Sequence, residues 1–169
     1  MPVTSISRID RFAIWLALAV PVAALGGALV SQYVFGLYPC EMCYWQRWPH
    51  WGALALAIPA LSLLALAPGL ARVLASAAAI AILISGLIGG FHAGVEYGWW
   101  EGVTACTSTV GGGQDVLSDI MNAPVIRCDQ PQWTLGGISL AGFNFLLSVS
   151  AGIVILILLW SKRKTTIRS

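Results

Sequence analysis

Four long apolar stretches constrain this chain more than any other feature of its sequence. They lie at about 12–30, 48–67, 73–94 and 140–160, and each carries few or no charges. A helix needs about 20 apolar residues to cross the hydrocarbon core of a bilayer. Hydrophobic residues make up 58% of the chain and charged residues 9%, against roughly 45–50% and about 25% in soluble domains. The sequence therefore predicts an all-α membrane protein, a single four-helix bundle in lipid over 1–169, with no nucleic-acid partner.

The positions of the basic residues indicate which loops face the cytoplasm. Seven of the nine lie in the N-terminal segment, in the turn between the second and third stretches, or in the C-terminal tail: Arg8, Arg11, Arg72, Lys162, Arg163, Lys164 and Arg168. By the positive-inside rule these segments, and with them both termini, are cytoplasmic. The loops at about 31–47 and 95–139 then face the other side of a bacterial inner membrane. All four cysteines lie there, in the periplasm, where disulfides persist.

The loop at 95–139 is the only sizeable segment outside the predicted spans, so a soluble partner must meet the protein there. Within it, residues 115–122 have the spacing of a short amphipathic helix, because Val116, Leu117 and Ile120 share one face. Such a helix either lies flat on the membrane or packs against other residues of the loop.

Cys40 and Cys43 form a C-x-x-C that follows Pro39 and begins the second predicted helix. Backbone N–H groups at a helix N-terminus favour a thiolate, so this pair is expected to exchange disulfides readily. Arg47 comes four residues after Cys43 and shares a helix face with it, which adds to that stabilisation. Haem attachment is excluded, because no histidine follows Cys43 directly.

Cys106 and Cys128 enclose 21 residues of the long loop. One interpretation is a disulfide that only orders the loop, worth about 3 kcal/mol on a chain-entropy estimate. The other is a redox pair, because a disulfide on a loop exchanges with a second one held at the membrane. A structural zinc site is not indicated, since these two cysteines do not form a second C-x-x-C.

The motif P-C-x-x-C-x-x-Q-R at 39–47, the four apolar stretches and the second cysteine pair together resemble the DsbB family, disulfide bond formation protein B. The run Q-W-T-L-G at 132–136, which leads into the last stretch, is similar to the place where that family returns to the membrane. The resemblance covers nearly the whole chain. Its combination of features is far more specific than a C-x-x-C alone.

What the resemblance implies is a quinone-dependent thiol:disulfide oxidoreductase. A DsbA-like periplasmic dithiol protein would attack the Cys106/Cys128 disulfide, Cys40/Cys43 would reoxidise that pair, and ubiquinone or menaquinone would reoxidise Cys40/Cys43. On the same resemblance, Cys106 would form the mixed disulfide with the partner. Cys43 would contact the quinone, and Arg47 would lie beside both, where its guanidinium could stabilise a thiolate and charge on a quinone oxygen.

Two histidines lie near these cysteines in the sequence. Some members of the family use a histidine near the third span for the quinone, so His92 is a candidate cofactor contact, with a hydrogen-bonded structural histidine as the alternative. Ionisable groups inside a membrane are functional candidates by default, which extends to Glu96. His50 is predicted to be a helix residue at the membrane interface.

Three alternative functions remain for comparison. An enzyme similar to vitamin K epoxide reductase would carry its C-x-x-C after the third span, whereas here it follows the first. A metal-binding or metal-transporting membrane protein would use Cys40, Cys43 and His50, since thiolates bind soft metals, but no ladder of acidic or histidine residues lines the spans. A conduit that carries electrons outward would need cysteines on the cytoplasmic side, where none is predicted.

Overall fold

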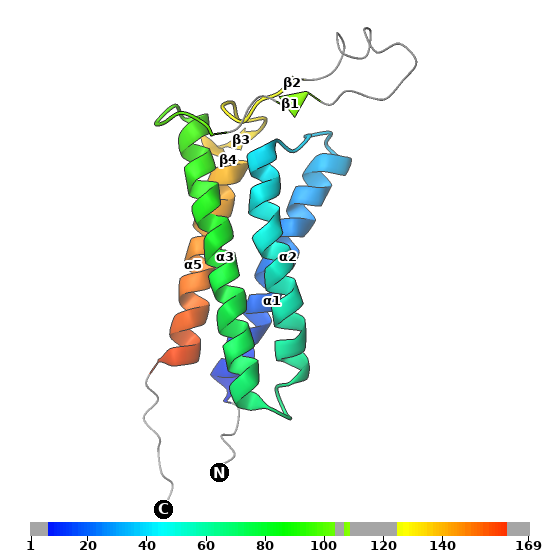
Figure 1. Ribbon diagram of the computed structural model, residues 1–169, viewed down its shortest axis with the longest axis vertical. Helices are drawn as coiled ribbons and strands as arrows, with labels where there is room; N and C mark the ends of the chain where they lie inside the picture. The colour runs from blue at the N-terminus through cyan, green and yellow to red at the C-terminus, as the bar shows by residue number, and fades with distance from the viewer. Residues whose placement is uncertain (1–6, 104–106, 109–124, 162–169) are drawn as a thin grey trace, which may run out of the picture.

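Four long helices make up most of the protein. The computed structural model describes residues 7–103, 107–108 and 125–161. The helices are α1 (Arg8–Tyr33), α2 (Glu41–Ser62), α3 (Pro68–Glu96) and α5 (Leu140–Trp160). They alternate in direction, so that α1 begins and α5 ends at the same end of the bundle as the turn between α2 and α3 (Figure 1). We call this the turn end, and we call the opposite end, where Cys40 caps the start of α2, the cysteine end.

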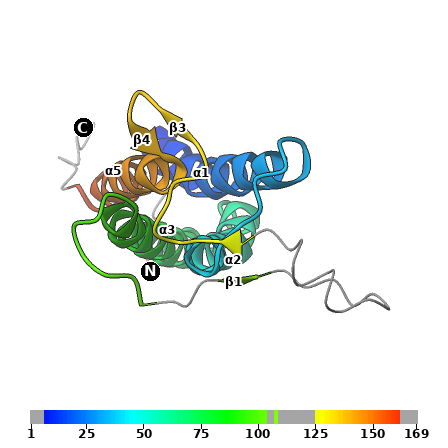
Figure 2. The same ribbon diagram turned by 90° about the horizontal axis from the view of Figure 1, so that it is seen from above.

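Within the ranges that the structure describes, four two-residue strands lie at the cysteine end (Figure 1). They are β1 (Thr107–Ser108), β2 (Val125–Ile126), β3 (Thr134–Leu135) and β4 (Ile138–Ser139). β1 pairs antiparallel with β2, and β3 with β4. Gly136 and Gly137 join β3 to β4 with φ values of 58° and 81°, a left-handed turn that glycine adopts without strain. The segment after β2 passes across the ends of α2 and α3 (Figure 2).

The mostly helical architecture is as predicted: the described residues form four helices, and three of these are long and apolar enough to cross a membrane. These are α1, α3 and α5. α2 is not among them: although it has 22 residues, it includes Glu41, Arg47 and other polar side chains. A fourth crossing by α2 therefore stays a prediction. The predicted helix at 115–122 lies outside the described residues.

α2 begins at Glu41, directly after Cys40, as predicted for the C-x-x-C, and it ends at Ser62, so that it overlaps the predicted membrane stretch at 48–67 only in part. The Cys40 sulfur accepts a hydrogen bond from the Cys43 N–H at 3.3 Å and so caps the helix, which begins seven residues before Trp48. At the other end the chain turns before Pro68, which is the first residue of α3. Apolar composition marks where lipid lies, but not where a helix starts.

Small residues let α3 pack closely on α5. A methyl group on Gly152 would lie 2.5 Å from Leu83 Cγ, and one on Gly86 would lie 2.8 Å from Val149 Cγ2. Four alanines of α3 are also buried within the bundle: Ala71, Ala75, Ala78 and Ala79. Close approach of backbones is the usual source of helix association in lipid.

At the turn end a buried ion pair joins α1 to α3. Ser7 and Asp10 form a capping box at the start of α1. The fully buried Asp10 carboxylate also accepts a hydrogen bond from Arg72 at 2.7 Å. The two helices thus begin side by side.

Candidate redox site

Cys40 and Cys43 are two thiols held together at the start of α2. Their sulfurs lie 3.0 Å apart, with Cys40 donating a hydrogen bond to Cys43. This bond from Cys40 holds the pKa of the Cys43 thiol below its ordinary value, and it raises the pKa of Cys40. Cys43 is therefore the more acidic thiol of the pair, and Cys40 is the buried partner, with 2% of its surface exposed.

Cys128 comes from the other end of the long loop and lies against Cys40. It belongs to a buried cluster with Cys40, Met42, Val95 and Ile126, and its side chain forms a hydrogen bond with the Cys40 sulfur. Cys106 lies outside the described residues. Three segments that are distant in the sequence therefore meet here: the cap of α2, the end of α3 and the segment after β2.

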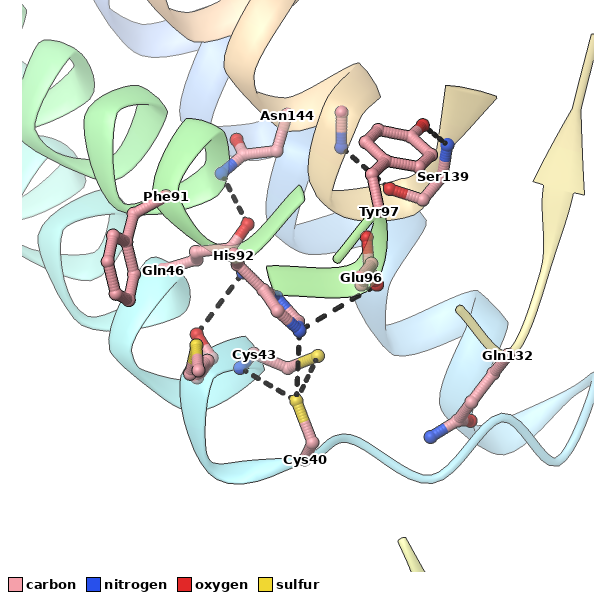
Figure 3. A network of polar contacts seen from close by, with 12 residues as sticks. Cys40, Cys43, Gln46, Phe91, His92, Glu96, Tyr97, Gln132, Ser139 and Asn144 are labelled. Carbon is pink, nitrogen blue, oxygen red and sulfur yellow. Dashed lines mark hydrogen bonds and ion pairs between the residues drawn. The ribbon is translucent and has the colours of Figure 1, made fainter. Parts of the chain in front are cut away.

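His92 links these segments. Its Nε2 lies 3.6 Å from the Cys40 sulfur and 3.7 Å from Glu96 Oε1 (Figure 3). The ring also hydrogen-bonds the backbone of Cys128. On its other side Nδ1 lies 2.8 Å from Gln46 Nε2. His92 is 2% exposed. Its contacts join the dithiol to the loop cysteine.

A backbone carbonyl fixes the proton on His92. Gln46 Nε2 donates to the carbonyl oxygen of Met42 at 3.2 Å, and a carbonyl only accepts, so this end of the Gln46 amide is the NH₂ group. His92 Nδ1 must then accept from Gln46. The hydrogen of the neutral ring is on Nε2, pointing to the cysteines and Glu96.

Arg47 lies one turn after Cys43 and is tied to α1. It donates to Gln32 Oε1 at 2.6 Å and to the Ala28 carbonyl at 3.3 Å, and its guanidinium lies over the Tyr44 ring. Its charge also helps to lower the pKa of Cys43, after the larger effect of the Cys40 hydrogen bond. Arg47 and Cys43 thus interact as their spacing predicted. Arg47 is also held by α1, which the spacing did not indicate.

A cavity of about 370 Å³ opens beside the cysteines. Its wall is largely apolar and comes from all four helices and the segment 127–133. The polar or ionisable residues on it include Cys40, Cys43, Gln46, Arg47, His50, His92, Glu96 and Asn144. A mostly apolar cleft with a few convergent polar groups is the usual form of a cofactor site.

Along one wall of this cavity runs a buried polar network that sequence reasoning missed. Asn144 donates to Gln46 Oε1 at 2.9 Å and to Ser85, and its Oδ1 lies 3.1 Å from His50 Nε2. His50, predicted to be a helix residue at the membrane interface, lies in α2 with its side chain only 3% exposed. The available signal was the helical spacing of Cys43, Gln46 and His50, which puts all three on one face.

The site also contains a possible metal-ligand set. The ligand atoms of Cys40, Cys43 and His92 all lie within 4.8 Å of one another. However, Nε2 of His92 carries the ring hydrogen, and a metal needs that nitrogen deprotonated. Moving the proton to Nδ1 would place it against the NH₂ group of Gln46. The described geometry therefore fits a dithiol better than a metal centre.

Comparison with known proteins agrees with this site. The sequence is 25% identical over 147 residues to an uncharacterized protein of Rickettsia prowazekii, which covers 83% of each chain. It is 51% identical over 37 residues, 22% of this chain and 23% of the relative, to disulfide bond formation protein B of Neisseria meningitidis, and the same holds for Neisseria gonorrhoeae. No match was found among solved structures.

The match to a whole family is more extensive. The family described as disulfide bond formation protein DsbB matches residues 10–158. That span includes all four helices, with the first two residues of α1 and the last two of α5 outside it, and all four cysteines. With a helical membrane architecture, a dithiol at the start of α2 and a loop cysteine against it, this chain belongs to the DsbB family of membrane proteins for disulfide bond formation.

Proposed function

We propose that the protein is an inner-membrane oxidase that takes electrons from a DsbA-like periplasmic dithiol protein and passes them to a membrane quinone. The observation that carries this proposal is the contact of Cys128 with Cys40 at the edge of the cavity that Cys43 and Arg47 line. One side of the dithiol faces the loop through which electrons would enter. The other side faces the cavity through which they would leave.

The proposed entry of electrons is a series of thiol–disulfide exchanges. A partner thiolate attacks Cys106 of a Cys106–Cys128 disulfide, so that a mixed disulfide forms and Cys128 leaves as a thiolate. Cys128 attacks Cys40 of a Cys40–Cys43 disulfide, and Cys43 leaves. The lowered pKa of Cys43 makes it the better leaving group.

The cycle then closes on the loop side. The second thiol of the partner attacks its own mixed-disulfide sulfur, so that the partner becomes a disulfide and Cys106 is released. Cys106 attacks Cys128 of the Cys40–Cys128 bond and re-forms Cys106–Cys128. The net result is that two electrons and two protons have moved from the partner to Cys40 and Cys43.

The residues of the cavity fit a quinone as cofactor. A bound ubiquinone or menaquinone would supply an acceptor for two electrons and two protons. Arg47 would hold a head-group oxygen beside Cys43, because a guanidinium donates hydrogen bonds and carries a fixed charge. His92 also borders the cavity, but both of its ring nitrogens already have partners. We therefore assign Cys43 and Arg47 the direct contacts and His92 the task of holding Gln46, Cys40 and Cys128 in place.

The proposed orientation places both termini in the cytoplasm and the cysteine end in the periplasm. It is supported by the position of the basic residues at the turn end. Arg8 and Arg11 lie in the first turn of α1, and Arg72 lies in the first turns of α3, at the same end of the bundle. This is the end that the positive-inside rule assigns to the cytoplasm.

The decisive experiment is anaerobic turnover of purified protein with a reduced DsbA-like protein and, in parallel, ubiquinone and menaquinone analogues. We expect quinone reduction with at least one of them. Cys106→Ala should no longer yield a trapped mixed disulfide with the partner, whereas wild-type protein should. Trapping of the complex by the variant at wild-type yield would refute the role of Cys106.

A metal-binding function is the second candidate, because three ligand atoms converge at Cys40, Cys43 and His92. It makes a separate prediction: reduced protein should bind one zinc ion tightly and lose it on His92→Gln. We expect instead weak zinc binding that does not depend on His92, measured by competition with a chelator.

A further inference from the structure

Two atoms on the residues that border the cavity have no hydrogen-bond partner in the part of the chain that the structure describes. They are His50 Nδ1 and Glu96 Oε2, and both are buried. Buried polar atoms without a partner are rare in proteins, because each loses its bonds to water for nothing in return. Such an atom beside a cofactor cavity is a place where the ligand itself can complete the bonding.

The hydrogen-bond network fixes the protonation of His50. Asn144 Nδ2 donates to the backbone carbonyl of Ser85 at 3.2 Å, which only accepts, so the amide oxygen must be the atom that faces His50. His50 Nε2 lies 3.1 Å from that oxygen and therefore carries the ring hydrogen. Ser148 does not alter this, because its hydroxyl donates to the same Asn144 oxygen. Nδ1 of the neutral ring is left as a bare acceptor.

His50 is also placed to reach a head group held at Cys43. The two residues are seven apart on α2 and border the same cavity, so their Cα atoms are separated by about 10 Å along the helix. Side chains of a helix lean toward its N-terminus, and for α2 this is the end at which Cys43 lies.

The chemistry of a bare acceptor selects one redox form of the ligand. The oxygens of a quinone only accept hydrogen bonds, whereas the hydroxyls of a hydroquinone also donate. We propose that His50 Nδ1 accepts a hydrogen bond from a hydroxyl of the reduced head group, so that this site binds hydroquinone more tightly than quinone. The inference rests on the proposed function, since it needs a quinone in the cavity.

Preferential binding of the reduced form has a consequence for the reaction. The dithiol and the quinone become a disulfide and a hydroquinone, and the two thiols supply both electrons and both protons. His50 neither gains nor loses a proton in this balance. Because it favours the product form, it raises the reduction potential of the bound couple and makes oxidation of Cys40 and Cys43 more favourable.

Glu96 is the weaker candidate for this role. Its carboxylate already interacts with His92 and with the hydroxyl of Ser139. Neither contact fixes whether the second oxygen carries a proton. For His50 the hydrogen-bond network does show which nitrogen carries the hydrogen. Only when an atom is known to be an acceptor can we say which redox form of the ligand it favours.

The first test measures binding rather than turnover. Oxidised full-length protein is titrated anaerobically with a short-chain ubiquinone and with its hydroquinone. His50→Phe keeps a ring and removes Nδ1 together with Nε2, which bonds Asn144 and not the ligand. We therefore expect hydroquinone affinity to fall about three- to tenfold, the worth of a typical hydrogen bond, with quinone affinity unchanged. Ser150→Ala is the control, because that hydroxyl bonds only carbonyls of its own helix.

Equal losses for both forms would mean that His50 merely shapes the cavity, and no loss would mean that Nδ1 does not meet the ligand; either overturns the inference. If wild-type protein binds neither form, the cofactor assignment itself fails, and this is visible without any variant.

A second measurement needs no change at His50. The chain has two histidines, so ¹⁵N-histidine spectra of wild-type protein are simple, and His92→Gln assigns them. Hydroquinone should shift the Nδ1 signal of His50 toward that of a hydrogen-bonded nitrogen, and quinone should not. An unmoved signal at saturating hydroquinone contradicts the proposal even if His50→Phe does not fold.

Discussion

The two ends of the bundle bury different kinds of side chain. Toward the turn end, alanines and Gly152 let the helices pack closely, and one ion pair between Asp10 and Arg72 is the main polar contact. Toward the cysteine end, the buried residues include histidines, Gln46 and cysteines, and a cavity separates the helices. The same four helices thus combine two halves. The close-packed half holds the helices together, whereas the polar half packs less closely and provides the groups for chemistry, as in other proteins where activity lowers stability.

The largest expected effect belongs to the cysteine end. Cys43→Ser should lower quinone-linked turnover on the order of a thousandfold or more, because a group that acts covalently has no substitute. Turnover is measured as anaerobic quinone reduction by a reduced periplasmic dithiol protein. Thermal stability should stay near wild type, since the hydroxyl is close to isosteric. Full turnover by the variant would show that electrons leave by another route.

Arg47→Ala comes next. Loss of a charged hydrogen-bond donor should raise the apparent quinone requirement by about ten- to a hundredfold, while disulfide exchange with the partner continues. Both are measured on one preparation, by quinone titration and by trapping of the mixed disulfide. Arg11→Ala removes an exposed arginine at the turn end and is the matched control. An unchanged quinone requirement for Arg47→Ala would remove this residue from the site.

Gly152→Ala tests the close-packed half. A methyl group there would lie 2.5 Å from Leu83 Cγ and 3.1 Å from the Ala79 carbonyl, and such overpacking destabilises a protein by about 1–3 kcal/mol. Unfolding in detergent measures the loss, and the pH profile of Cys43 alkylation should not change. Gly26→Ala, where a methyl group would meet nothing within 4 Å, should be neutral. If both substitutions behave alike, the turn half is less tightly packed than described.

The smallest expected effect concerns the charge balance at Cys43. The Glu96 carboxylate raises the pKa of this thiol and Arg47 lowers it. Glu96→Gln should therefore move the alkylation profile of reduced Cys43 to lower pH, because the thiolate persists further into acid. Arg47→Ala should move the profile in the opposite direction. Shifts of the same sign would contradict the opposed charges.

Sequence alone predicts the bundle better than the site. The apolar stretches located α1, α3 and α5, because a helix exposed to lipid must be apolar over its length. The apolar stretch at 48–67 did not give the bounds of α2, because this helix starts earlier, at its Cys40 cap, and ends earlier, at Ser62. The spacing of Cys40, Cys43 and Arg47 along one helix is local, so it was accessible. The contacts of Arg47 with Gln32, of His92 with Gln46 and of His50 with Asn144 join residues 15 to 94 positions apart. No helical or strand periodicity encodes such pairs.

The sulfur of Cys40 is at once a redox atom and the cap of a helix. It accepts a hydrogen bond from the Cys43 N–H at 3.3 Å. The same sulfur in a disulfide is a poorer hydrogen-bond acceptor than in a thiol or thiolate. The first turn of α2 is therefore held most firmly in the reduced protein. The redox state of the protein should therefore be measurable at one backbone amide. The N–H of Cys43 should exchange with deuterium faster once Cys40 is oxidised.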